Sequence, residues 1–154
     1  MNFASRAPEL LAAAELGVGL AGVVAGDQNT QRGDGEAALI ELTATDGYRL
    51  TATRYSAPRT PRGNLIVAGA IGVPQSFYRR FARFAAARGY TTMTFDYRGI
   101  ARSAPPSLKG FRMNCLDWGR LDLAAAVEAM SAPGVALYMV GHSFGGHAFG
   151  LLPN

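Results

Sequence analysis

Apolar and polar residues alternate along two neighbouring segments near the start of the folded part of this chain. The segments span residues 37–45 and 48–55, and Asp46-Gly47 lies between them. Such alternation predicts strands with one buried face, and Asp-Gly between two strands is a strong signal for a two-residue hairpin turn. The pattern therefore predicts an antiparallel pair of strands at the edge of a sheet.

Three later segments are predicted to be strands, at 64–68, 90–95 and 135–140. The first and last are continuous apolar runs, typical of buried strands in a parallel sheet. A helix is expected from residue 74 to about 89. Phe77, Phe81 and Phe84 recur there at helical spacing while the arginines fall largely elsewhere, so this helix is predicted to be amphipathic. A second helix is expected over 117–130, where helix formers dominate. The order predicts an α/β fold, an antiparallel edge hairpin leading into a mostly parallel sheet with flanking helices.

The last predicted strand runs into Gly141-His142-Ser143-Phe144-Gly145, and a segment that could begin a helix follows. A Gly-x-Ser-x-Gly sequence between a strand and a helix is the sharp turn, or elbow, that exposes a serine nucleophile. Gly141 and Gly145 are expected where a Cβ would crowd the neighbouring strand and helix. The competing interpretation is a glycine-rich turn with an incidental serine, and the strand and helix around the motif favour the nucleophile.

A polar loop, Asp96-Tyr97-Arg98-Gly99, follows the strand at 90–95. Strand, Asp-Tyr-Arg-Gly loop, helix, strand and Gly-His-Ser-Phe-Gly elbow together resemble the α/β-hydrolase superfamily over about residues 37 to 154. The nearest resemblance is to its lysophospholipase-like and serine aminopeptidase-like predicted hydrolases. The resemblance implies a serine hydrolase that cleaves an ester, or an amide, through an acyl-enzyme on Ser143, and a mainly structural role for the Asp96 loop.

The resemblance also implies an oxyanion hole made of two backbone N–H groups. Phe144, directly after the nucleophile, matches one donor. Ala70 matches the second, although Ala68-Gly69 stands where many members have His-Gly, and Ile71 matches equally well. No catalytic role is implied for Asp96.

The triad acid and base of the family would be expected after later strands, and eleven residues follow Ser143 in this sequence (154 − 143). The two histidines are His142 and His147. The first belongs to the elbow with its side chain turned away from the nucleophile's face, and the second would lie on the helix beneath the site, so neither is expected to be the base. We therefore expect an amino-terminal half of a hydrolase fold that is inactive by itself. The alternative is a non-catalytic α/β fragment or scaffold.

Residues 1–35 are expected to form a loosely ordered leader and linker ahead of an incomplete hydrolase domain at 36–154. The apolar stretch at 10–26 is interrupted by a glutamate and is too short for a stable membrane span. An export signal is an alternative, with Val23-Val24-Ala25 as the cleavage site. The segment 17–22 matches G-x-G-x-x-G but lacks a preceding strand and a following helix, so no dinucleotide cofactor is predicted.

The composition of the chain argues against several other classes of function. The formal net charge is +4, but the arginines are scattered without interleaved aromatics, so nucleic-acid binding is not expected. Two histidines and one cysteine do not provide the spacing of a metal site. The single cysteine, Cys115, excludes an internal disulfide and is typical of a reducing, cytoplasmic compartment. The predicted partner is a small-molecule ester or amide, and no motif specifies its identity or the oligomeric state.

Overall fold

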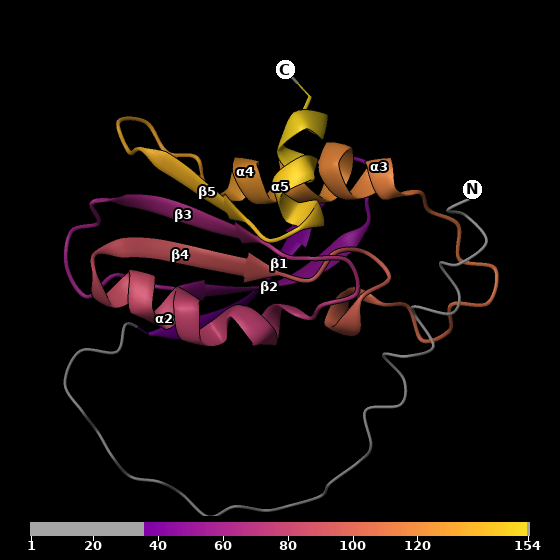
Figure 1. Cartoon of the computed structure of the whole chain (residues 1–154), viewed down its shortest axis with the longest axis horizontal. Helices are drawn as coiled ribbons and strands as arrows, with labels where there is room; N and C mark the ends of the chain where they lie inside the picture. The colour runs from indigo at the N-terminus through magenta and orange to yellow at the C-terminus, as the bar shows by residue number, and fades with distance from the viewer. Residues whose placement is uncertain (1–35, 154) are drawn as a thin grey trace, which may run out of the picture. The chain divides into compact units, whose positions relative to one another are not determined.

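The computed structural model describes residues 36–153, which form one mixed sheet flanked by helices (Figure 1). The leader and linker expected at 1–35, with the export-signal and dinucleotide interpretations of that segment, lie outside the described residues. The strands are β1 (Ala37–Thr43), β2 (Arg49–Tyr55), β3 (Gly63–Ala68), β4 (Tyr90–Phe95) and β5 (Leu137–Gly141). They lie in the order β1-β2-β4-β3-β5. β1 and β2 are antiparallel, β4 is antiparallel to β2, and β3 is parallel to both β4 and β5, which confirms the predicted fold class.

The turn between β1 and β2 is wider than the predicted two-residue hairpin. Thr43 pairs with Arg49, so residues 44–48 make the connection. The Asp46 carboxylate accepts from the Tyr48 N–H at 3.2 Å within this connection. It also accepts from the side chain of Arg98, which is distant in sequence. The tight bend at Gly47, with φ of +84°, therefore lies inside a longer loop.

The register of β3 and β5 brings two loops together. Ala68, the last residue of β3, pairs with Gly141, the last residue of β5, in a parallel ladder. Because parallel strands end at the same edge of a sheet, the loop after β3 and the elbow after β5 lie side by side. This juxtaposition positions the candidate site.

The helix after β3 begins with a short 3₁₀ turn, η2 (Gln75–Tyr78), and continues as α2 (Arg79–Ala87). Its predicted apolar face is wrong, because Phe77, Phe81 and Phe84 are 68%, 41% and 52% exposed. The residues that pack on the sheet are instead Tyr78, Ala82, Ala85 and Ala86. Alanine side chains let the helix lie close to the strands, and the bulkier phenylalanines are left outside. Figure 1 shows α2 on one side of the sheet and α4 (Ala124–Met130) and α5 (Phe144–Ala148) on the other.

The helix predicted over 117–130 is present with an unexpected middle. It starts as α3 (Cys115–Asp117), passes through a π-helical segment, η4 (Trp118–Leu123), and ends as α4. Asn114 caps the start, since its side chain accepts from the Leu116 N–H at 2.8 Å. Short 3₁₀ turns are η3 (Ala101–Ser103), after β4, and η5 (Phe149–Leu151), after α5.

β5 is less buried than its apolar sequence predicts. Tyr138 and Val140 are 49% and 42% exposed. Within residues 36–153, β5 pairs with β3 on one side and with no strand on the other. Its side chains therefore lack the second neighbour that would cover them. Across the same described range, none of the helices has the length and apolar character needed to span a membrane.

Candidate functional site

Ser143 lies between the end of β5 and the first residue of α5, in a strained backbone conformation. Its φ is +53° and its ψ is −117°, a combination that a residue with a Cβ rarely adopts. The residue is exposed. Strained backbone of this kind gathers at functional sites, where the surrounding structure holds it in place. The predicted elbow is therefore present as a backbone geometry.

Two glycines make this bend possible, as expected from the motif. A Cβ built on Gly141 would meet the backbone nitrogen of Gly146, and one built on Gly145 would meet the carbonyl oxygen of Ala68. By contrast, a Cβ on Gly146 would have its nearest neighbour 3.9 Å away. The crowding is thus confined to the points where α5 packs against β5 and the end of β3. A further hydrogen bond, from the His142 N–H to Ala68 O at 3.0 Å, joins the elbow to β3.

The backbone N–H groups predicted to form the oxyanion hole differ in whether they already donate a hydrogen bond. Phe144 begins α5, and no hydrogen bond within residues 36–153 uses its N–H. The Ala70 N–H donates to Tyr78 Oη at 2.8 Å. The alternative donor, the Ile71 N–H, has no acceptor among the described residues. The loop after β3 therefore offers one occupied and one free N–H beside the elbow.

Neither histidine is bonded to the candidate nucleophile. His142 Nδ1 lies 3.0 Å from Tyr78 Oη, and its ring stacks on Phe77 with the centroids 6.4 Å apart. His147 is exposed in the last turn of α5. In the described part of the chain, no hydrogen bond joins Ser143 to either imidazole.

Asp96 is buried and serves to hold the loop after β3 in place. Its Oδ1 accepts from the Gln75 N–H at 2.7 Å, and its Oδ2 accepts from Gln75 Nε2 at 3.0 Å. Gln75 Oε1 in turn accepts from Thr94 Oγ1 at 3.0 Å. These bonds fix the start of η2 to the end of β4, which fits a structural role for Asp96.

A buried ion network beside the site was missed by sequence reasoning. Arg98 donates through Nε and its backbone N–H to Asp122, at 2.7 and 2.8 Å, and through both terminal nitrogens to Asp46, at 2.6 and 3.1 Å. Asp122 lies on η4, and its side chain is fully buried. The Asp-Tyr-Arg-Gly motif held a usable signal, because a buried arginine requires carboxylate partners.

The pKa values of the two carboxyl groups in this network are shifted in opposite directions. Burial raises the pKa of Asp122 to about 6, against the opposing effect of its hydrogen bonds from Arg98. The hydrogen bonds from the Arg98 side chain hold the pKa of Asp46 below its ordinary value. The difference follows from exposure, since the Asp46 side chain is 41% exposed and that of Asp122 is not exposed.

The aromatic rings of Tyr97, Trp118 and Phe144 pack against one another. The Tyr97 ring lies 5.5 Å from the Trp118 ring and 6.2 Å from that of Phe144, the residue after the nucleophile. Trp118 is buried, and its Nε1 donates to Arg98 O at 3.0 Å. The Tyr97 hydroxyl is buried with no hydrogen-bond partner among the described residues, and burial raises its pKa.

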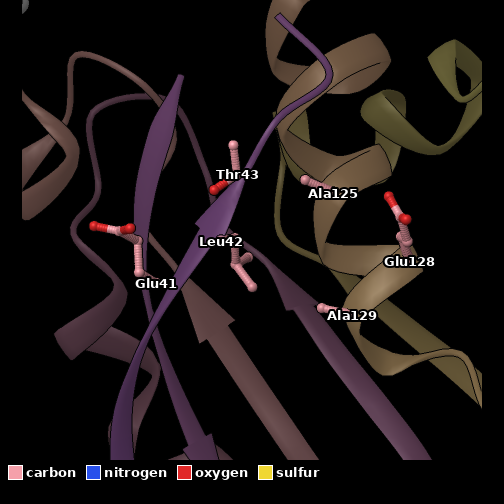
Figure 2. Close-up of a pocket in the computed structure, with 6 residues that line it drawn as sticks. All are labelled: Glu41, Leu42, Thr43, Ala125, Glu128 and Ala129. Atoms are coloured by element: carbon pink, nitrogen blue, oxygen red, sulfur yellow. The ribbon is translucent and has the colours of Figure 1, made fainter. Parts of the chain in front are cut away.

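A separate pocket of about 280 Å³ lies between β1 and α4 (Figure 2). It is lined by Glu41, Leu42, Thr43, Ala125, Glu128 and Ala129. β1 is at the opposite end of the sheet from β5, and none of the predicted site residues lines this pocket. Within residues 36–153, no group of three or more histidine, cysteine or acidic side chains could hold a metal ion.

Proteins of known structure have a similar architecture. A model of the alpha/beta hydrolase family matches residues 65–152. An esterase from Pyrococcus furiosus is 19% identical with a TM-score of 0.63, over 81% of this chain and 47% of that one. A carboxyl esterase from Bacillus coagulans is 16% identical with a TM-score of 0.58, over 73% and 38%. An α/β serine hydrolase without a lid from Xanthomonas campestris is 22% identical with a TM-score of 0.56, over 73% and 53%. None of the curated proteins compared with the chain matches it.

These structures share the fold, and the chain spans 38% to 53% of their lengths. The family match includes β4, the Asp-Tyr-Arg-Gly loop, β5 and the elbow, and it extends over more than half of the sequence. The strand order and the strained serine agree with it. This chain belongs to the alpha/beta hydrolase family.

Proposed function

We propose that Ser143 is the nucleophile of a hydrolase that cleaves carboxylic esters, or amides, through an acyl-enzyme. The observation that carries the proposal is the positive φ of an exposed serine at the start of a helix. Holding a serine in this backbone conformation costs free energy, and the conformation presents the hydroxyl to a substrate. Two of the similar structures are described as esterases, which favours an ester over an amide.

The chemistry assigns roles to the groups around the serine. Ser143 Oγ attacks the carbonyl carbon, and the negative charge that develops on the carbonyl oxygen accepts hydrogen bonds from backbone N–H groups. Phe144 supplies one, and the loop after β3 supplies the other. The Ile71 N–H is free for this purpose, while the Ala70 N–H donates to Tyr78 Oη. The alcohol leaves, and water then releases the acid from Ser143.

The Ser143 proton needs an acceptor that this sequence does not supply. Both of its histidines are accounted for, His142 by Tyr78 and His147 by its place on α5. We therefore propose that the acid and base belong to polypeptide outside this sequence, and that the 154-residue chain by itself is inactive. A non-catalytic scaffold is the second candidate, and the lack of any hydrogen bond from Ser143 to a described histidine favours it.

Ester turnover with Ser143→Ala as the control tests the proposal. The protein as produced from its own gene is expected to hydrolyse p-nitrophenyl esters, and Ser143→Ala should lower kcat/KM by about 10³-fold or more. The 154-residue chain is expected to show no turnover that depends on Ser143. If the gene product is active and Ser143→Ala leaves that activity unchanged, Ser143 is not the nucleophile.

The partner that we propose is a small-molecule ester or amide. A cytoplasmic location is proposed from Cys115, which is exposed and unpaired, because free thiols persist in reducing compartments.

A further inference from the structure

One buried hydroxyl joins the two loops of the candidate site. Tyr78 Oη lies 2.8 Å from the Ala70 nitrogen and 3.0 Å from His142 Nδ1. The first partner belongs to the loop after β3, and the second is the residue before Ser143. Tyr78 is 8% exposed, so water competes little for these bonds.

The chemistry of the backbone N–H fixes the direction of the first bond. A backbone N–H only donates, so Tyr78 Oη accepts from Ala70. The hydroxyl has one proton, which is then available for the unprotonated Nδ1 of a neutral imidazole. The hydroxyl donates to Nδ1 when the ring proton of His142 is on Nε2, and it accepts from Nδ1 when the proton is there. In either tautomer, Tyr78 Oη bridges Ala70 and His142.

Packing leaves the Tyr78 ring little freedom to move. A Cβ built on Gly69 would lie 2.9 Å from Tyr78 Cε2, so the loop backbone rests directly on the ring. On the other side, the His142 ring meets the Tyr78 ring edge to face, with the centroids 6.0 Å apart. A side chain held on two sides can act as a fixed spacer between them.

We propose that Tyr78 is a positioning residue, whose hydroxyl fixes the loop bearing the second oxyanion donor against the elbow bearing Ser143. This inference rests on the proposed function. Ile71, the free donor, directly follows Ala70, and Ser143 directly follows His142. The Tyr78 bridge therefore joins the two residues that precede the free donor and the serine, and so limits the distance between Ile71 and Ser143. A displacement of about 1 Å between reacting groups can slow a reaction by about 100-fold.

The bridge itself is tested without any activity measurement. In the protein produced from its own gene, the Nδ1 nitrogen of His142 should show the ¹⁵N shift of a hydrogen-bonded nitrogen. Tyr78→Phe should move that shift and speed amide exchange at Ala70 by about tenfold or more. Tyr97→Phe is the matched control, since it removes a buried hydroxyl that has no described partner. It should change neither quantity.

The rate of fluorophosphonate labelling at Ser143 then tests the consequence. Tyr78→Phe is expected to slow labelling by about 10- to 100-fold, and Tyr97→Phe to change it by less than about twofold. If the ¹⁵N shift and Ala70 exchange do not respond to Tyr78→Phe, the bridge is absent and the proposal is overturned. If they respond but labelling keeps its rate, Tyr78 does not position the site. If the unaltered protein is not labelled at Ser143, the proposed function fails, while the ¹⁵N shift and the exchange rate still decide whether the bridge exists.

Discussion

Ser143 shows how a few small residues make a strained conformation possible. Its backbone conformation costs on the order of 1–3 kcal/mol, which the surrounding packing must offset. Gly141 and Gly145 allow α5 to approach β5 and Ala68 more closely than any side chain would permit. The hydrogen bond from the His142 N–H to Ala68 O holds the same contact. The strain is thus maintained by the close packing of the elbow on β3.

Alanine at two adjacent glycines tests this explanation. Gly145→Ala should lower the free energy of unfolding by about 1–3 kcal/mol, because its Cβ would meet the Ala68 carbonyl oxygen. Gly146→Ala is the matched control in the same helix, where the nearest atom is 3.9 Å away. It should leave stability unchanged or raise it by about 0.5–1 kcal/mol, as alanine does in helices. Urea unfolding measures both, and equal effects would show that the approach of α5 is not limited by Gly145.

The Arg98 network gives stability a pH dependence of predictable sign. The pKa of Asp122 is raised to about 6, so between about pH 4 and 6 the folded chain binds more protons at this carboxyl than the unfolded chain does. The stabilisation is fully present below the ordinary pKa and is lost as the pH rises through 6. The free energy of unfolding should therefore fall over that range, by on the order of 1–3 kcal/mol.

Asp122→Asn removes the titrating group and should abolish this slope. Glu128→Gln, at an exposed carboxyl on α4, is the control and should preserve it. Urea unfolding at intervals from pH 4 to 7 provides the measurement. A free energy of unfolding that rises with pH across this range in the unaltered protein would contradict the assignment.

Among the elements, those governed by local patterns were predictable from the sequence. β4 has the predicted bounds, and β3 and β5 are parallel, since runs of apolar residues between turns specify such strands. The face of α2 that packs on the sheet was not predictable. The periodicity of the sequence identifies a helix with two different faces, but the close approach of the helix to the sheet decides that the alanines, rather than the phenylalanines, contact it. The exposure of β5 likewise depends on which strands neighbour it.

The same division holds within the site. The Gly-x-Ser-x-Gly motif consists of five adjacent residues, and the crowding expected at Gly141 and Gly145 is present. The contact between Tyr78 and His142 joins residues 64 positions apart, and that between Arg98 and Asp46 joins residues 52 apart. No local pattern carries such distances, so these contacts became visible only in the folded chain.

Substitutions on α2 test which of its faces packs on the sheet. Ala82, which is fully buried, should not accommodate a larger side chain, and Ala82→Leu is expected to destabilise the protein by about 1–3 kcal/mol. Phe81, one residue earlier and 41% exposed, should accept Phe81→Gln with a loss below about 1 kcal/mol. Thermal unfolding distinguishes the two. A larger loss from Phe81→Gln would restore the phenylalanine face that the sequence pattern suggested.

At the scale of the whole molecule, the described residues place the candidate elbow at the end of the outermost strand, β5, beside the loop after β3. β5 carries the elbow and has no strand beyond it in residues 36–153. Tyr138 and Val140 are consequently exposed, which is unusual for a parallel strand. The chain spans 38% to 53% of the lengths of the similar structures.

The most direct test of the central claim is to map the residue modified by a fluorophosphonate. The protein produced from its own gene would be labelled, digested and analysed by mass spectrometry, with Ser143→Ala in parallel. We predict one phosphonylated residue, Ser143, and no labelling of the variant. Modification at another serine, or a variant that is labelled as rapidly as the unaltered protein, would contradict the assignment of Ser143 as the nucleophile.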